Sequence, residues 1–439
     1  MHFFALSLYP NPHRRQTRTF YGAEPALLKE VTVTLYLSLI AAIALIVVLL
    51  RKKIPIGIAI LLSGLWIWVV NDRTVSHLGT AVINAFELPR NWDLLFALYF
   101  VMCLEIQLRE SGTLKGMVEG LNGFFSSTKV ILSAMPAFLG LLPSLGGARF
   151  SCPIVEEASR DLTISPESKA SINFWFRHIF EFSSPIVPGL LLGCSIAHIQ
   201  IGDFIAHLAW VTVLSFVAGW VVMIRTLRFT DKPRDHVLSQ DERKTGLFNI
   251  ALAIAPIVFN VVLMLVFGLS AALSMGLVTL CLFPVLWAVG RPVSIPHTLK
   301  KAFDVKLLGN VACILTFIQL LSVSGVLNAI TQSFEHSTLP VPIIIAFISL
   351  MIGTLTGMSQ AHVAMVMPLV AQLAPGSLEL AGIAMIFGVA GQMWTPTHVC
   401  LTISIDYFKA DFLRTLKPIM LAEGILLLVF SLWTYFTWS

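Results

Sequence analysis

Two interruptions of the same kind divide long apolar stretches of this chain. The first comprises Pro143–Ser151 and then Ser183–Pro185, and the second comprises Gly353–His362 and then Thr395–His398. Gly, Ser, Thr and Pro at membrane depth free backbone polar groups that lipid cannot satisfy, so such breaks persist only beside a polar cavity. Paired interruptions in the two halves of a chain are typical of the binding site of a secondary transporter.

The composition predicts an integral membrane protein. The chain is 56% apolar and 12% charged, with a mean hydropathy of +0.84, whereas soluble domains average about 45–50% and 25%. The formal charge of +5 does not indicate nucleic-acid binding, because the basic residues lie in short loops between apolar runs. Six cysteines are isolated in apolar segments: Cys103, Cys152, Cys194, Cys281, Cys313 and Cys400. Without a C-x-x-C motif they are expected to be small buried hydrophobic residues, with neither disulfides nor a zinc site.

Apolar runs of about 20 residues predict ten transmembrane segments. They lie near Val31–Leu50, Ile54–Val70, Trp92–Leu108, Asn173–Ala197, Phe204–Ile224, Leu247–Phe267, Ala271–Val289, Leu307–Ala329, Gly382–Ile405 and Leu416–Tyr435. Two further pairs of runs have arms too short to cross, and they are expected to form re-entrant hairpins. These pairs are Val130–Leu142 with Phe150–Ala158, and Val341–Leu355 with Ser359–Ala374.

The two halves are predicted to be inverted repeats. Each half contains five crossings and one hairpin, and because five is odd the second half starts on the opposite side of the membrane. Equivalent residues recur at one spacing, since Pro185 and Pro396 lie 211 residues apart, as do Glu181 and Gln392.

A short motif also recurs, because Ser111–Leu114 (SGTL) is similar to Ser324–Leu327 (SGVL). We therefore predict an all-α polytopic membrane protein whose two inverted repeats each have about five transmembrane helices, one re-entrant hairpin and one discontinuous helix. The predicted units are a disordered N-terminal tail over residues 1–30, a first repeat over 31–226, a cytoplasmic linker over 227–246 and a second repeat over 247–439.

Loop charges predict the orientation. With the N-terminus outside, 21 Lys and Arg residues lie in cytoplasmic loops, and only Arg73 and Arg90 lie in outer loops. This distribution satisfies the positive-inside rule at every short loop and predicts a multi-pass protein of the cell (inner) membrane. The first hairpin then opens from the cytoplasm and the second from outside.

Four half-helix N-termini are predicted to point into the membrane interior. Ser151 or Cys152 is expected to cap the returning arm of the first hairpin, and Ser359 that of the second. Ser184 and Thr395 each precede a proline, which is the pattern of a new helix start. Such ends carry unpaired N–H groups and about half a positive charge, worth ~0.3–1 kcal/mol when exposed, and they favour an anion.

The predicted substrate-binding residues line the hairpin tips and the breaks. They are Ser144, Gly146, Gly147, Arg149, Ser151, Ser184, Thr356, Gly357, Ser359, Thr395 and Thr397. Unwound carbonyls and hydroxyls at the opposite helix ends are the groups that coordinate Na⁺ in such folds. The alternative is that these prolines merely kink helices packed within protein.

Arg149 is the charged residue at the first hairpin tip. A guanidinium near the membrane midplane usually faces a cavity or a partner. Bidentate pairing with a substrate carboxylate is one interpretation. The other is a structural ion pair with Glu156, Glu157 or Glu181.

The predicted ion-coupling residues are His178, Glu181, Gln392 and His398. Glu181 is expected to lie on one helix face with His178, deep enough to act as a proton carrier, cation ligand or partner of an arginine. Gln392 occupies the equivalent place in the second half, so only one half keeps a titratable group there. The alternatives are a buried ion pair between Glu181 and Arg177, and structural roles for the histidines.

The first-half motif resembles a known family. Leu142–Pro153 (LPSLGGARFSCP), Ser165–Lys169 (SPESK) and Asn173–Glu181 (NFWFRHIFE) are similar to an uncharacterised family of ten-span prokaryotic membrane proteins, the domain of unknown function 401. That family is grouped with the ion transporter superfamily. The resemblance implies two inverted repeats, each with a re-entrant hairpin and a discontinuous helix, and a possible homodimer. Where the dicarboxylate branch has Ser-Asn-Thr tips, this chain has Gly146–Arg149 and Thr356–Ser359.

These patterns predict a secondary active transporter of a small organic anion of the carboxylate type, coupled to H⁺ or Na⁺ within a lipid membrane. Enzyme motifs are missing from the sequence, since it has no H-E-x-x-H, no G-x-S-x-G and no G-x-x-x-x-G-K-[ST]. We therefore expect neither catalysis nor a cofactor. The alternatives are a cation/proton antiporter without an organic substrate, and a polytopic membrane enzyme or assembly factor that binds a lipid headgroup.

Overall fold

The computed structural model describes residues 25–124, 127–141, 148–160, 162–227, 239–335 and 337–438, which form helices without strands. Within them, the first half contains α1 Pro25–Arg51, α2 Ile56–Asn71, α3 Val75–Glu87, α4 Pro89–Glu110, α5 Thr113–Phe124, α6 Thr128–Gly140, α7 Ala148–Ala158, α8 Pro166–His178, α9 Pro188–Ala197, α10 Ile201–Gly219 and the π-helical turn η1 Trp220–Ile224. The second half contains α11 Gln240–Phe267, α12 Ala271–Ala288, α13 Ile295–Ala302, α14 Val305–Val323, α15 Val326–Glu335, α16 Val341–Thr356, α17 Ser359–Leu373, α18 Leu378–Met393, α19 Val399–Phe408 and α20 Phe412–Thr437.

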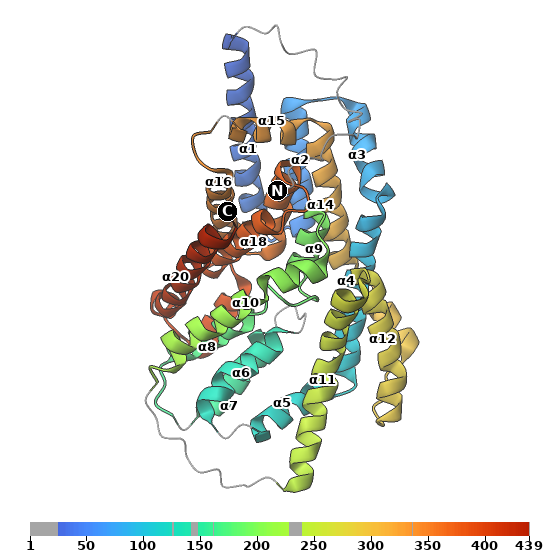
Figure 1. The fold of residues 1–439 in the computed structure, drawn as a ribbon, viewed down its shortest axis with the longest axis vertical. Helices are drawn as coiled ribbons and strands as arrows, with labels where there is room; N and C mark the ends of the chain where they lie inside the picture. Colours follow the sequence, from blue (N-terminus) through green and yellow to red (C-terminus); the bar gives the residue numbers. More distant parts are fainter. Residues whose placement is uncertain are drawn as a thin grey trace, which may run out of the picture.

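The elements of the two halves correspond one to one. In each half, three helices precede a long helix (α4 or α14), and a short amphipathic helix, a helical hairpin, a broken helix and a last long helix follow. Equivalent helices also pack across the two halves. α2 and α3 of the first half pack on α14 of the second, and α12 and α13 of the second half pack on α4 of the first. Likewise α9 packs on α17, and α7 packs on α19. The halves are therefore interlocked, with α1, α2, α3 and α14 in one bundle and α4, α11 and α12 in another (Figure 1). Their inversion across a membrane stays a prediction.

The described helices have the length and surface of membrane spans. Seven of them are long and apolar enough to cross a membrane by length and composition: α1 over Thr34–Arg51, α4, α10 with η1, α11, α12, α14 and α20. Large apolar side chains on them face outward, with Val266 71% and Trp287 75% exposed. An exposed apolar surface of this extent is expected to contact lipid rather than water. The chain is thus a multi-pass membrane protein that is all-helical in its described residues, which confirms this part of the predicted fold class.

One predicted span is wrong at its end. The segment Leu307–Ala329 divides into α14, which ends at Val323, and the separate helix α15. Gly325 has a φ of +71°, a left-handed conformation that turns the chain and ends the helix. Its counterpart Gly112, with a φ of +72°, follows α4 in the first half. The repeated SGTL and SGVL motifs therefore mark the same turn in both halves.

Most of the helices that the apolar runs did not predict are short and amphipathic. α3, α5, α13 and α15 alternate polar and apolar faces at helical spacing, so no window within them is continuously apolar. α1 begins at Pro25, inside the predicted tail, and residues 1–24 lie outside the described residues. α11 begins inside the predicted linker, because Ser239 and Glu242 form a capping box at its N-terminus.

Helix α8 lies at the centre of the packed core. Every residue from Ala170 to His178 is buried, although this segment contains Asn173, Arg177 and His178. α6, α7, α19 and α20 pack around it. A helix buried on all sides is usually apolar all round, so polar side chains on α8 require partners within the protein.

Candidate functional site

The two broken helices have equivalent backbones. From Ser184 and Thr395 onward, the breaks show the same pattern of turns, 211 residues apart. Each leads into a ten-residue helix, α9 or α19, whose last turn is closed by a residue with left-handed backbone, His198 or Lys409. Because turns, helix length and helix end all agree, the spacing of 211 residues marks a structural equivalence.

The breaks differ where they begin. α8 ends at His178, so residues 179–187 are non-helical, whereas α18 continues to Met393 and leaves only residues 394–398. Glu181 consequently lies in a turn after α8, where its N–H donates to the His178 carbonyl at 3.1 Å, and the predicted shared helix face is wrong. Its equivalent, Gln392, is still within α18. The first break is therefore longer than the second, and Glu181 lies in a turn whereas Gln392 lies in a helix.

Three predicted helix caps are corrected by the structure. α9 begins after Val187, α17 after Met358 and α19 after His398, and none of these three residues caps its helix with a side chain. Ser184 lies four residues before α9, and Ser359 is the first residue of α17 rather than its cap. The first-turn N–H groups of these helices are therefore free of side-chain caps, which is the condition for anion binding at a helix N-terminus.

Local chemistry explains where α9 and α19 start. Pro188, rather than Pro185, stands in the first turn of α9, where a missing N–H leaves no bond unmade. Thr395 Oγ1 accepts from the Thr397 backbone N–H at 3.3 Å, so this hydroxyl closes a turn within the break instead of capping a helix. In the first hairpin, α7 already begins at Ala148, so Ser151 lies inside the helix.

The tip of the second hairpin lies between the two breaks. Gly357 closes α16 with a φ of +65°, and a Cβ on it would collide with Thr397 Oγ1. Thr397 Oγ1 lies 2.9 Å from Thr395 Oγ1. On the other side of the tip, a Cβ on Gly189 at the start of α9 would lie 2.8 Å from Ser359 Oγ. Predicted substrate-binding residues of the second hairpin and second break thus share one region with the N-terminus of α9.

For the other predicted residues discussed next, the described side chains do not join this region, or the side chain is not described. The Thr356 hydroxyl donates to the Ile352 carbonyl at 2.8 Å, within its own helix. Ser144, Gly146 and Gly147 lie outside the described residues. Arg149 is in the first turn of α7, where only its backbone is described, and Ser151 is fully buried.

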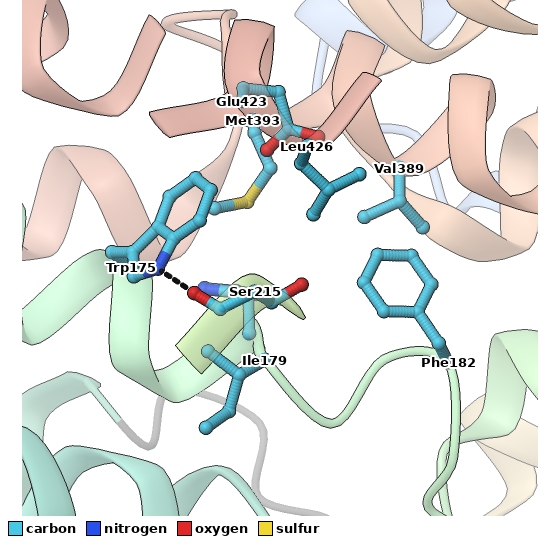
Figure 2. A pocket seen from close by; sticks show the side chains of 9 residues that line it. Trp175, Ile179, Phe182, Ser215, Val389, Met393, Glu423 and Leu426 are labelled. Carbon is cyan, nitrogen blue, oxygen red and sulfur yellow. Dashed lines mark hydrogen bonds between the residues drawn. The ribbon is translucent and has the colours of Figure 1, made fainter. Parts of the chain in front are cut away.

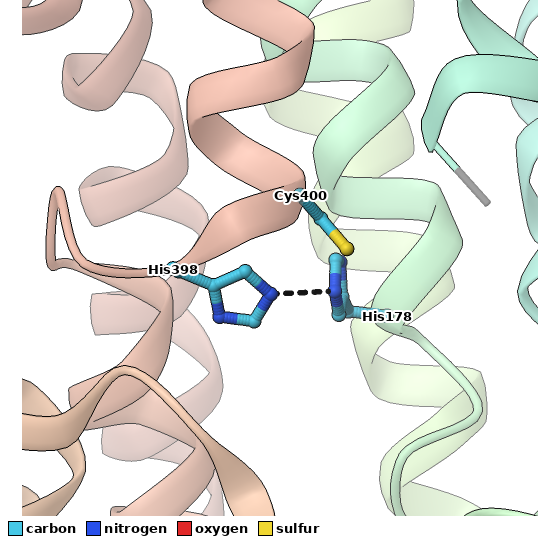
Figure 3. A group of neighbouring side chains, drawn as sticks. All are labelled: His178, His398 and Cys400. Atoms are coloured by element: carbon cyan, nitrogen blue, oxygen red, sulfur yellow. Dashed lines mark hydrogen bonds between the residues drawn. The ribbon is translucent and has the colours of Figure 1, made fainter. Parts of the chain in front are cut away.

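A histidine pair joins the two breaks. His178 Nε2 and His398 Nε2 lie 3.1 Å apart, and both side chains are buried. His178 Nδ1 donates to the Phe174 carbonyl at 2.6 Å, because a carbonyl can only accept. His178 Nε2 therefore accepts in the neutral pair, and His398 Nε2 donates to it. Figure 3 shows this pair with Cys400 beside it, and the three side-chain ligand atoms lie within 4.8 Å of one another.

Arg177 is a buried cation without an acidic partner in the described residues. The residue is 8% exposed, and no described residue offers a hydrogen-bond acceptor to its Nε or Nη1. The guanidinium lies near the Cys400 sulfur, and no carboxylate oxygen of the described residues lies within 4.0 Å of it. The alternative ion pair between Arg177 and Glu181 is therefore not in contact, although the two charges are near enough to attract each other. A buried charge of this kind costs several kcal/mol unless something pairs with it.

Seven buried side-chain atoms at or next to the two breaks have no hydrogen-bond partner in the described residues. On the first break they are Arg177 Nε and Nη1, Glu181 Oε2 and Ser184 Oγ, and on the second they are Gln392 Oε1, Trp394 Nε1 and His398 Nδ1. Buried polar groups in folded proteins are nearly always hydrogen-bonded. Their clustering where three uncapped helix N-termini also lie indicates a place for water or a small polar ligand.

Comparison with known proteins gives the family. The family described as "Protein of unknown function (DUF401)" matches residues 32–435. The chain belongs to this family. The resemblance seen in the first-half motif is thus confirmed over nearly the whole sequence. No curated protein matches the chain.

Among solved structures, the YdaH transporter of Alcanivorax borkumensis has a similar fold. The TM-score is 0.59 with 14% sequence identity, over 84% of this chain and 90% of that chain. That structure is described as revealing an unusual topology. At this identity the likeness concerns the fold alone.

In this family member, sequence analysis missed two residues of the site. Cys400 was expected to be a small hydrophobic residue, yet it lies beside His178 and His398. Arg177 was considered only as a partner of Glu181. The spacing His398-x-Cys400 was the available signal, because it places a second ligand-type side chain at the start of α19. The contribution of Arg177 depends on α19 packing against α8, which no local pattern reveals.

A second buried carboxyl shares a cavity with His178 and with Ile179 and Phe182 of the first break. Glu423 on α20 is 2% exposed, and its Oε1 has no partner in the described residues. With Trp175 and Ser215 it lines an internal cavity of about 10 Å³ (Figure 2). Ser215 Oγ also lacks a partner. A cavity of this size holds about one water molecule, which could satisfy both atoms.

Gly388 on α18 is predicted to be required for folding. A Cβ at this position would collide with the ring of His362, a fully buried side chain on α17. We expect Gly388→Ala to destabilise the protein by about 1–3 kcal/mol, as overpacking does, and to lower the unfolding temperature in detergent. Gly424→Ala on α20 is the control, because nothing lies within 4 Å of its Cβ. Equal unfolding temperatures for the two variants would show that α17 and α18 do not pack this closely.

Proposed function

We propose that this protein is a secondary active transporter of a small organic anion, coupled to H⁺ or Na⁺. The observation that supports this most is the buried Arg177 guanidinium, whose Nε and Nη1 lack acceptors at the junction of the two breaks. An arginine at the centre of a membrane helix costs about 2.5–3.5 kcal/mol even by the mildest scale. A site that keeps such a charge unpaired is suited to an anion that supplies the missing acceptors. A carboxylate fits this role, because hydrogen bonds from a guanidinium to a carboxylate oxygen are charge-assisted and strong.

The helix ends support the same class of substrate. α17 and α19 begin beside the docked hairpin tip, and Gly189, the second residue of α9, lies next to Ser359. Each uncapped N-terminus adds about half a positive charge and free N–H donors. Together with Arg177 they favour one small anion over a large or apolar ligand. The predicted residues Gly357, Ser359, Thr395 and Thr397 would then contact the substrate through hydroxyls and backbone.

Coupling is assigned to Glu181. Its Oε2 has no partner in the described residues, and Gln392 stands at the equivalent position of the second half. One carboxylate in an otherwise duplicated pair of breaks provides a single site for a coupling cation. The fold similarity to a protein described as a transporter supports transport as the general activity.

Reconstitution tests the proposal. Purified protein in liposomes should exchange an internal unlabelled carboxylate for an external labelled one, and the exchange should accumulate label when a Na⁺ or proton gradient is imposed. The substrate class is first found by a thermal-shift screen of organic anions, with and without Na⁺, at two pH values. Liposomes that show no exchange of any anion that raises the unfolding temperature would refute the proposal.

A cation/proton antiporter is the second candidate, and the unpartnered Glu181 carboxylate favours it. In that case a pH gradient should drive cation flux without any organic solute. Flux of this kind, together with failure of every anion to bind, would assign Glu181 to exchange and leave Arg177 as a structural charge. Turnover of lipid without either flux would instead favour a headgroup-binding enzyme or assembly factor.

A further inference from the structure

We propose that His178, His398 and Cys400 form a binding site for a borderline-soft transition-metal ion, of which Zn²⁺ is the representative. The site lies beside the proposed anion position and does not depend on it. It joins the end of α8 in the first half to the start of α19 in the second. This role replaces the ion-coupling role that the sequence predicts for the two histidines.

The ligand geometry fits a tetrahedral ion. Zinc–nitrogen bonds of about 2.0–2.1 Å at a tetrahedral angle place two nitrogens about 3.3 Å apart. His178 Nε2 and His398 Nε2 are already 3.1 Å apart. A zinc–sulfur bond of about 2.3 Å places the sulfur about 3.6 Å from each nitrogen. The Cys400 sulfur lies within 4.8 Å of both, so a shift of about 1 Å completes the set.

The outer contacts of the cluster also match a metal site. Histidine ligands usually donate their other ring N–H to a backbone carbonyl, which fixes the tautomer and directs the lone pair at the ion. His178 does this through Nδ1, which donates to the Phe174 carbonyl at 2.6 Å. The Phe174 ring packs against both imidazoles, with centroids 4.6 Å from His178 and 5.1 Å from His398. The two rings are therefore held by packing as well as by hydrogen bonds.

Ligand type selects the ion. Imidazole and thiolate suit Zn²⁺, whereas Na⁺ and Mg²⁺ prefer oxygen ligands. On binding, the proton on His398 Nε2 moves to Nδ1, which has no partner in the described residues, and the Cys400 thiol proton leaves to solvent. Three protein ligands leave the fourth position of a tetrahedral ion open, as in zinc sites that exchange a ligand.

Two features of the cluster bear on metal binding: the hydrogen bond between the histidines and the charge of Arg177. A hydrogen bond between the histidines explains their spacing without an ion, but it gives no role to the adjacent cysteine. Arg177 opposes a cation by charge repulsion, and it also reaches the Cys400 sulfur. Its donors would stabilise a metal-bound thiolate, and the thiolate charge would screen the guanidinium from the ion. Cys400 is only partly buried, so the third ligand is not fully enclosed by the protein.

The experiment measures metal binding directly, without transport. Tag-free protein is stripped with a chelator and titrated with Zn²⁺, and Co²⁺ replaces Zn²⁺ for spectroscopy. We expect one ion per chain, a tetrahedral Co²⁺ spectrum and a thiolate-to-cobalt charge-transfer band. Cys400→Ser should abolish that band, and His398→Gln should weaken Zn²⁺ binding by more than the ~10–100-fold typical of losing an outer contact.

Matched controls keep the outcome clear. Cys194→Ser removes a buried cysteine of α9 outside the cluster, and His77→Ala removes a surface histidine beside Asp72. Both should retain the ion and the spectrum of the unmodified protein. Wild-type protein that takes up no Zn²⁺, or a Co²⁺ spectrum that Cys400→Ser leaves unchanged, would overturn the proposal. Arg177→Gln should lose anion binding yet keep the metal, so failure of the metal site and failure of the transport proposal give different results.

Discussion

Arg177→Gln should abolish anion binding while the protein still folds. Two nitrogens of the guanidinium, Nε and Nη1, have no partner in the described residues, and separate oxygens of a substrate anion would accept from them. Hydrogen bonds to charged groups contribute about 1.5–3 kcal/mol each, so their loss should weaken binding by about 100- to 1,000-fold or more. Isothermal titration or a thermal-shift titration with the screened anion measures this change.

The stability of the same variant separates function from structure. Removing an unpaired buried charge relieves a desolvation cost, so the unfolding temperature without ligand should stay equal or rise. A structural arginine would instead lower it. Arg109→Gln is the control, because Arg109 pairs with Glu105 at the end of α4 and is 45% exposed. Unchanged anion affinity in Arg177→Gln would refute the assignment of this residue to the substrate.

Arg149→Ala addresses the other arginine of the proposed site. The sequence predicts that this residue clamps a carboxylate from the first hairpin tip, so its removal should also abolish binding without preventing insertion. If both variants lose binding, the hairpin and the break act on one anion. If only Arg149→Ala loses binding, the anion site lies at the first hairpin rather than at the junction of the breaks.

Glu181→Gln should uncouple transport from the ion gradient. The amide keeps the shape of the carboxyl and lacks its charge, so it cannot hold a coupling cation. Exchange of labelled for unlabelled anion should continue in liposomes, while gradient-driven accumulation should fall to the level of equilibration. The substituted protein would then resemble the second half, which already has Gln392 at this position.

Glu423→Gln is the matched control for that experiment. It also neutralises a fully buried carboxyl, but one carried by α20, which lines a cavity with Ser215 and His178. We expect it to keep gradient-driven accumulation. Accumulation by Glu181→Gln at the level of the unmodified protein would exclude Glu181 as the coupling residue, and loss in Glu423→Gln alone would move that role to α20.

Local sequence was a reliable guide to the helices and the duplication. Apolar runs predicted the long helices, since lipid-facing segments must be continuously apolar. Prolines 211 residues apart predicted equivalent breaks, and the structure extends that equivalence to the ends of α9 and α19. Caps were less predictable, because Ser184 and Thr395 can satisfy a turn as well as a helix end. Amphipathic helices such as α5 escaped notice because they lack an apolar run.

By itself, the sequence determined that this is a duplicated, polytopic helical protein with polar breaks in each half, because spacing and hydropathy are properties of neighbouring residues. Only the tertiary structure decided which polar residues meet. His178 and His398 are 220 residues apart yet lie 3.1 Å from each other, and Cys400 joins them. Among the described residues, Arg177 Nε and Nη1 lack acceptors although Glu181 lies only one turn further along the chain. Such partnerships depend on how two halves pack, and packing couples residues that no local pattern relates.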